Sequence, residues 1–162
     1  MTVFTATERR AHALAAVSHG GSYGVKNLTS TVEVTVATST GDTINFGYIP
    51  SNARILGSSK LYWDDMATTG APTMDLGLAA VDNNLVNADD PDALSNGHAL
   101  ATATPTGAIA ITPIENHGLP AWDLVASETV DPGGSLKVYG TMLDAVTTQT
   151  GTATLELYHV ID

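Results

Sequence analysis

The segment from Gly20 to Gly24 is the place where the sequence comes closest to a catalytic motif. It reads Gly-Gly-Ser-Tyr-Gly, which fits the G-x-S-x-G pattern of hydrolases whose nucleophile is the central serine, here Ser22. In those enzymes a strand precedes the serine and a helix follows it directly. The residues after Ser22 alternate as in a strand, so the segment is interpreted as a junction and no catalytic residue is assigned.

The acidic segment 82–96 is a second candidate site, because hard cations such as Ca²⁺ bind carboxylate and carbonyl oxygens. Its oxygen-bearing side chains include Asp82, Asn84, Asn87, Asp89, Asp90 and Asp92. The EF-hand spacing fails, since Val86 occupies the third ligand position and no glycine follows it. Two interpretations remain: a structural ion, or a solvated loop in which Asp89 to Leu94 form one helical turn before Asn96-Gly97. No metal ligand is assigned.

Histidine and cysteine offer no further chemistry. The five histidines (His12, His19, His98, His117 and His159) are scattered, and no two have a spacing that would hold a metal on one element. The chain has no cysteine, which excludes a disulfide scaffold, a thiolate metal site and a cysteine nucleophile. No cofactor is expected.

The charge of the chain restricts its partners. Seventeen acidic and six basic side chains give a formal net charge of -11, so phosphate backbones and anionic lipid would repel it, and no direct nucleic-acid or membrane partner is expected. Arg9, Arg10 and Lys26 make the first 26 residues comparatively basic. These charges either lie on an acidic partner surface or are ordinary solvated charges. No apolar run approaches the roughly 18 residues of a membrane span, and we expect synthesis in a cytosol, with use there or after release by lysis.

The elements that would position such residues are mostly short strands. Residues 1–21 are predicted to be an arm, with a capping box at Thr5-x-x-Glu8 that could start a short helix through about Val17. Alternation in Thr31–Val36 and Asp42–Ile49 around a turn predicts a hairpin. Ala53–Trp63 is predicted to be one extended run that bends at Gly57. Further strands are predicted at Thr73–Leu78, Ala99–Thr104, Ala108–Thr112, Asp123–Ser127, Ser135–Leu143 and Gly151–Val160.

Eight or nine strands and almost no helix-period sequence predict an all-β fold. We expect one domain over residues 22–162, an antiparallel β-sandwich or jelly roll. The aromatic residues in or beside its strands are expected in the core or at an oligomer interface; they are Trp63, Trp122, Tyr48, Tyr62, Tyr139 and Tyr158. Sugar binding by an exposed aromatic, at Trp63 or Trp122, is the alternative.

Three segments in this order resemble small jelly-roll decoration (cement) proteins of tailed-bacteriophage capsids. They are Ser22-Tyr-Gly-Val25, the run from Ile44 to Gly77, and Ala153-Thr-Leu-Glu-Leu-Tyr158. The middle run contains the bend Ile49-Pro-Ser-Asn-Ala-Arg-Ile55 and the triplet Asp75-Leu-Gly77, with the acidic turn Ala88–Asp92 after it. Where the family often has a basic or aromatic pair after that turn, this chain has Ala93-Leu94.

The resemblance implies a non-enzymatic structural virion protein. It would bind the major capsid protein on the outside of the head, as a homo-trimer near local threefold axes, and clamp neighbouring capsomers; synthesis would take place in the bacterial host cytoplasm. The candidate partner contacts are Arg9, Arg10, Tyr23 and Lys26. The alternative is a receptor- or carbohydrate-binding β-sandwich of a phage head fibre or tail.

Overall fold

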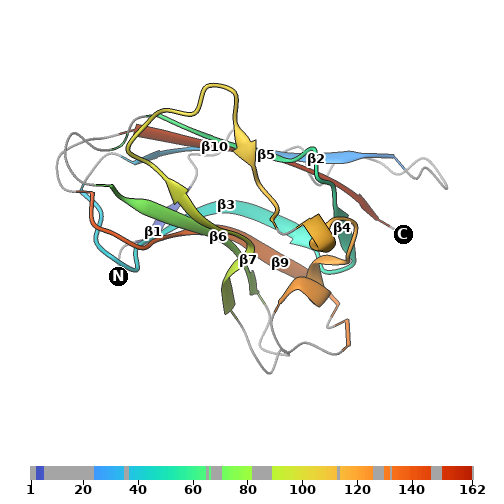
Figure 1. Ribbon diagram of the computed structural model, residues 1–162. Coiled ribbons are helices and arrows are strands. Elements are labelled where there is room, and N and C mark those ends of the chain that lie inside the picture. The colour runs from blue at the N-terminus through green and yellow to red at the C-terminus, as the bar shows by residue number, and fades with distance from the viewer. Residues whose placement is uncertain are drawn as a thin grey trace.

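Two β-sheets lie face to face in the computed structural model (Figure 1). It describes residues 3–5, 24–34, 37–64, 66, 71–81, 89–112, 114–125, 130–131, 133–146 and 151–161. Sheet A has the order β1 (Val3–Thr5), β3 (Thr43–Pro50), β9 (Ser135–Met142), β6 (Thr73–Ala80) and β7 (Asp89–Ala99). Sheet B has the order β2 (Lys26–Val34), β10 (Gly151–Ile161), β5 (Lys60–Trp63) and β8 (Ala108–Ile109), and β4 (Ala53–Ile55) also pairs with β10.

The predicted all-β sandwich is confirmed. All strand pairs are antiparallel except that between β1 and β3, which is parallel. Helical structure in the described part of the chain consists of two 3₁₀ turns, η2 (Ile114–Asn116) and η3 (Ala121–Leu124). No helix in that part is long and apolar enough to cross a membrane.

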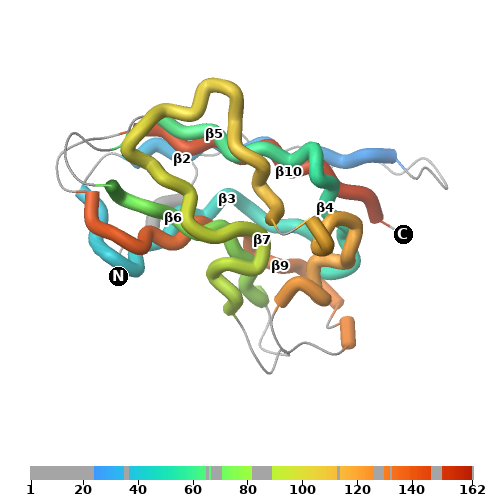
Figure 2. The backbone as a smooth tube through the Cα atoms, in the orientation of Figure 1, coloured from blue at the N-terminus to red at the C-terminus, as the bar shows by residue number. Residues whose placement is uncertain are grey.

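The core lies between the sheets and follows from strand alternation, because successive side chains of a strand point to opposite faces. In β10, Ala153, Leu155 and Leu157 are fully buried, while the residues between them are half-exposed. Ile44 and Phe46 of β3, which belongs to the opposite sheet, are also buried. The chain crosses between the layers after β7, where the yellow segment in Figure 2 rises from sheet A to reach β8 in sheet B.

The predicted hairpin of residues 31–36 and 42–49 is wrong. β2 pairs with β10, placing Leu28 opposite Leu157, while β3 pairs with β9. The turn at residues 39–42 is present, and the Asp42 amide donates to the Ser39 carbonyl over 3.0 Å. It connects the two sheets instead of two paired strands, so the local turn signal was correct and the partner assignment was not.

The predicted helical turn from Asp89 to Leu94 is also wrong, because these residues belong to β7. β7 is an edge strand, where Pro91 is tolerated since a proline there need not remove a ladder hydrogen bond. The β6–β7 register shifts twice, which indicates bulges, and these accommodate the irregular sequence.

Other boundaries differ from the prediction in smaller ways. The run 53–63 forms two strands, β4 and β5, joined by a turn in which the Ser59 amide donates to the Leu56 carbonyl over 3.0 Å. Residues 100–104 lie outside any strand, and η3 replaces the strand predicted from Asp123. Val3–Thr5 forms β1, whereas the predicted arm helix lies outside the described residues.

Candidate functional site

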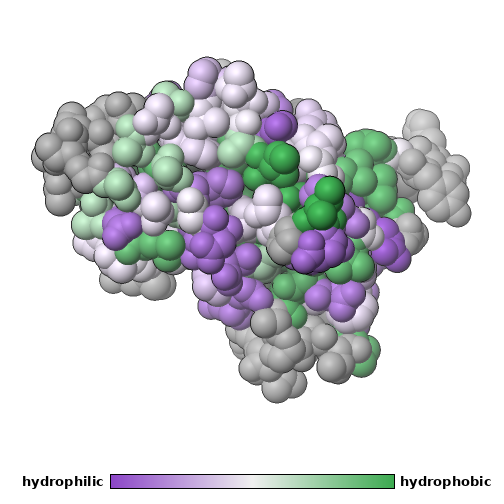
Figure 3. All heavy atoms as spheres, viewed as in Figure 1, coloured by the Kyte–Doolittle hydropathy of each residue, from purple (hydrophilic) through white to green (hydrophobic). Residues whose placement is uncertain are grey.

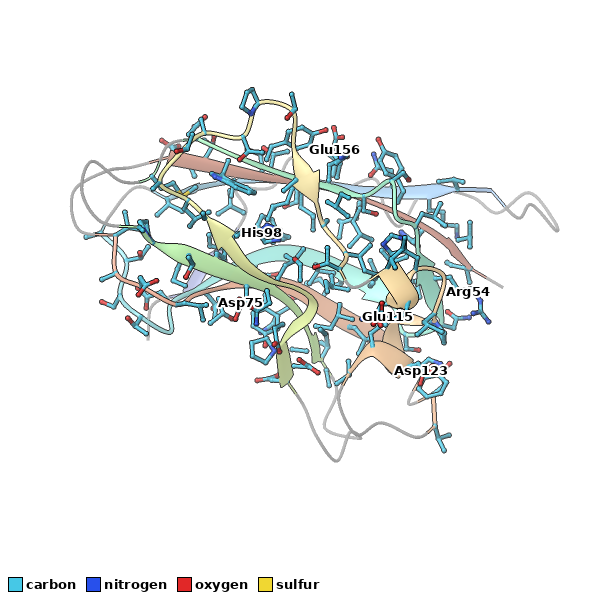
Figure 4. All side chains as sticks on the ribbon, viewed as in Figure 1. Arg54, Asp75, His98, Glu115, Asp123 and Glu156 are labelled. Atoms are coloured by element: carbon cyan, nitrogen blue, oxygen red, sulfur yellow. The ribbon has the colours of Figure 1, made fainter. Side chains whose placement is uncertain are left out.

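A serine, a histidine and a carboxylate come together at the bulged end of β7. The Ser95 Oγ and the His98 Nε2 are 2.6 Å apart, and the Asp75 Oδ1 accepts a hydrogen bond from the Gly97 amide at 2.8 Å. His98 lies between the sheets, and Asp75 lies on sheet A (Figure 4). Ser95 is 1% exposed, so its hydroxyl is closed to a substrate in this conformation. These residues therefore stabilise the bulge. Asp75 binds the backbone amide of Gly97, and His98 provides the hydrogen-bond partner of the Ser95 hydroxyl.

Trp63 holds the same histidine from sheet B. The Trp63 and His98 ring centroids are 5.4 Å apart with the rings tilted by 58°. The Trp63 indole N–H donates to the Thr102 carbonyl over 2.9 Å, so this side chain ties together β5, β7 and the segment after β7. Sequence reasoning missed the Ser95–His98 pair, since its partners lie in a segment predicted to be a loop.

One half-buried histidine, His98, and one buried histidine, His159, give the fold a pH dependence. Burial lowers the pKa of His98, and burial followed by the charge of Lys26 lowers the pKa of His159. A group whose pKa is depressed in the folded state takes up its proton more readily on unfolding. Stability is therefore fully present above the ordinary histidine pKa near 6.5 and is lost as pH falls through that value toward the folded-state pKa values.

We expect a lower melting temperature at pH 5.5 than at pH 7.5, measured by calorimetry at constant ionic strength. The His98→Gln variant, which cannot titrate and retains a polar group for Ser95, should show a smaller difference between the two pH values. Burial also raises the pKa of Asp75, which acts in the opposite direction but at a lower pH, nearer the ordinary aspartate pKa. An equal pH difference in both proteins would contradict the assignment to His98.

The edge of sheet A at β7 is acidic. Asp89 and Asp92 are exposed and Asp90 is half-exposed, and hydrophilic side chains gather over β6 and β7 in Figure 3. Burial, together with Asp89, Asp90 and Asp92, raises the pKa of Tyr139 to about 12, and Lys137 Nζ lies 4.6 Å from the centre of that ring. Within the described residues no three metal-ligating side chains form a group that could hold an ion, and residues 82–88 lie outside them.

The aromatic residues fall into buried and exposed groups. Trp63 and Tyr139 are buried, as expected for core residues, and Trp122 packs partly buried against the core. Tyr48 is 49% exposed on sheet A. Trp63 therefore cannot serve as a sugar-stacking platform, which removes one of the two tryptophans on which that alternative depended.

The outer face of sheet B is polar and internally hydrogen-bonded. Thr31 Oγ1 and Thr154 Oγ1 lie 2.9 Å apart across the β2–β10 pair. The Tyr62 hydroxyl donates to the Glu156 carboxylate over 3.2 Å; burial and this carboxylate raise the pKa of Tyr62. Thr152 donates to Asp64 through both its amide and its hydroxyl, which lowers the pKa of Asp64. These bonds hold the side chains of the face in fixed positions.

Of the four partner-contact residues predicted from sequence, Lys26 alone lies within the described part of the chain, so their grouping stays a prediction. Lys26 begins β2, half-buried and opposite His159, whose Nδ1 is buried without a hydrogen-bond partner. Arg9, Arg10 and Tyr23 lie outside the described residues, as does Ser22.

Among the strands that the structure describes, β2 is paired along one edge only and is open along the other. Its paired edge adjoins β10, and the Tyr158 amide and carbonyl are bonded on the side of β10 away from β2, to Ser59 Oγ and the Leu56 amide. Since hydrogen-bonded and non-hydrogen-bonded pairs alternate along an antiparallel ladder, Asn27, opposite Tyr158, directs its N–H and C=O to the open edge. The same applies to every second residue, namely Thr29, Thr31 and Glu33.

Two solved structures share this fold over nearly the whole chain. A chain of the Cyanophage Pam1 capsid asymmetric unit has a TM-score of 0.60 and 24% identity, covering 92% of this chain and 93% of that one. A chain of the capsid of Ralstonia phage GP4 has a TM-score of 0.60 and 18% identity, covering 99% of each chain. At these identities the similarity establishes a shared fold. No protein-family model matches the sequence, and no curated protein matches it.

Proposed function

We propose that this chain is a non-enzymatic structural virion protein that binds the outer surface of a tailed-phage capsid and clamps neighbouring capsomers. The observation that carries the proposal is the fold shared, over 92% and 99% of this chain, with chains of two phage capsid structures. A fold alone does not determine function, so the charge and the construction of the molecule have to be consistent with the proposed role as well.

The charge is consistent with an external position. A formal charge of -11 would repel packaged DNA, which favours a place on the outside of the head over one in its interior. The major capsid protein is the proposed partner, and a homo-trimer at local threefold axes is the proposed arrangement.

The construction suits a rigid clamp. Both sheets contribute to one continuous core, and side chains such as Trp63 fix the segments that connect them. A protein of this kind can transmit load between two attachment points without internal rearrangement, because close-packed interiors have low compressibility.

The test is binding to heads of the phage that encodes the chain. Purified protein should bind expanded heads with saturable stoichiometry, fail to bind unexpanded procapsids, and increase the temperature at which heads release DNA. An antibody raised against the folded protein and added outside intact particles should also bind them. Binding to neither form of the head would overturn the proposal, and failure of the antibody to bind intact particles would overturn the external position.

A glycan array is the matched control. The proposal expects no glycan signal from the isolated protein. A specific signal, lost in a Trp122→Ala variant that still folds, would instead favour the receptor-binding alternative.

A further inference from the structure

The open edge of β2 has the features of a strand edge that can pair with a further strand. It is nine residues long, and its register with β10 is continuous, without the bulges seen between β6 and β7. Its residues alternate strictly between buried and outward-facing positions from Asn27 onward. Proteins commonly block an open edge with proline, a bulge or an inward-pointing charge. β2 contains no proline, and its two charged residues, Lys26 and Glu33, lie near its ends.

The sequence of β2 is self-complementary about Ser30. In an antiparallel pair of two β2 strands centred on this residue, Thr29 would lie opposite Thr31 of the second copy, and Leu28 opposite Val32. Asn27 would lie opposite Glu33. Each pair joins residues of similar or compatible chemistry, and cross-strand threonine pairs are favourable.

The backbone agrees with this register. Thr29 and Thr31 both direct their N–H and C=O groups to the open edge, as deduced above, so each such pair would exchange two hydrogen bonds with the second copy. The two copies are related by a twofold axis perpendicular to the sheet. In this register even-numbered residues of β2 lie opposite even-numbered residues of the second β2, and odd-numbered opposite odd-numbered. The buried faces of both strands therefore lie on one side of the joined sheet, and the polar faces lie on the other. A contact of this kind is isologous: each residue pair occurs twice.

A buried hydroxyl lies at the centre. Ser30 is 7% exposed, and its Oγ is buried without a hydrogen-bond partner. An unpartnered buried polar group costs free energy. In the proposed register Ser30 meets Ser30 of the second copy at a directly opposed position, where side chains approach most closely, and the two hydroxyls can bond to each other.

We propose that β2 of one copy pairs antiparallel with β2 of a second copy about a twofold axis at Ser30. The result is a continuous sheet that runs through both molecules. This inference does not depend on the proposed virion function, since it concerns the isolated protein. It also differs from a trimer contact, which is heterologous, so a twofold β2 contact could link protomers of neighbouring trimers on a particle.

Cross-linking tests the register, and the cysteine-free chain provides a clean background. Thr29→Cys protein mixed with differently sized Thr31→Cys protein should give several-fold more disulfide-linked heterodimer under mild oxidation than either variant gives alone. The reason is that directly opposed Cα atoms lie within the disulfide range, whereas the same residue in two copies is displaced diagonally. Thr154→Cys, on the central strand of the same face, is the matched control and should not cross-link.

Proline tests the edge. Thr31→Pro removes an N–H that points away from β10, so it should preserve the fold and abolish pairing. Wild-type mass by sedimentation should rise from 16.7 kDa toward twice that value with concentration, while Thr31→Pro should stay at the lower value. Thr31→Ala loses the same hydroxyl but retains the N–H, and should behave as wild type.

The cross-linking result decides the matter if the proline variant fails to fold. Equal yields from mixed and single cysteine variants would overturn the proposal, as would a wild-type mass of 16.7 kDa at all concentrations. The latter result would indicate that a second copy of the chain does not occupy this edge. A trimer that persists in Thr31→Pro and shows no cross-link through β2 would equally exclude the twofold pair.

Discussion

Gly77→Ala is expected to lower the free energy of unfolding by about 3 kcal/mol, the upper end for overpacking a core. A Cβ at position 77 would overlap the backbone of Asp90 and Pro91, where β7 crosses directly over β6. Backbone atoms of a paired strand cannot move aside as the end of a side chain can. The loss should appear as a lower urea midpoint with an unchanged slope, because the surface exposed on unfolding stays the same.

Gly151→Ala is the matched control. Gly151 also lies in a strand, but its added Cβ would meet the flexible Met66 side chain at 3.0 Å. We expect a change within about 1 kcal/mol, as for a tolerated core substitution. Equal midpoints for the two variants would show that β7 does not press on β6 at Gly77.

Trp63→Ala is expected to cost about 3–5 kcal/mol, the usual range for removing a buried aromatic side chain. Trp63 is 8% exposed, and its loss would remove the contact with His98 and the hydrogen bond to Thr102. Water entering the cavity should also move the pKa of His98 back toward its ordinary value. Chemical denaturation measures the first effect, and an NMR titration of the histidine ring measures the second.

Trp63→Phe separates packing from hydrogen bonding. It retains most of the apolar side chain and loses the indole N–H, so about 1 kcal/mol should be lost, typical for one hydrogen bond. An alanine variant as stable as the phenylalanine variant would contradict a packing role for Trp63.

The strands predicted best were those with clean alternation or apolar runs between turns. β3, β6, β9 and β10 were all predicted within a few residues of their observed bounds. The pairing partners were not, because alternation shows which face of a strand is buried but not which strand lies beside it. β2 and β3 are neighbours in sequence, yet they belong to different sheets.

Local sequence patterns could not predict the bulged edge strand β7. Asp89, Pro91 and Gly97 favour a capped turn by their intrinsic preferences, and tertiary contacts with β6 override them. One signal was present: a glycine within a strand, such as Gly77, often marks a close approach of another backbone. The Ser95–His98 pair follows from that bulge, and it could not be predicted while the segment was assigned to a loop.

β10 lies in the interior of sheet B and has consequences for the order of folding. Thr31 and Thr154 meet across the β2–β10 pair although they are 123 residues apart in the chain. At about 5–20 residues per second, a ribosome needs roughly 6–25 s to make that interval. Throughout this time β2 has no partner in its own sheet, and long-range pairing is itself slow. Sheet B therefore closes only after β10 has left the ribosome, and nascent chains stalled before Gly151 should be the species that bind chaperones most strongly.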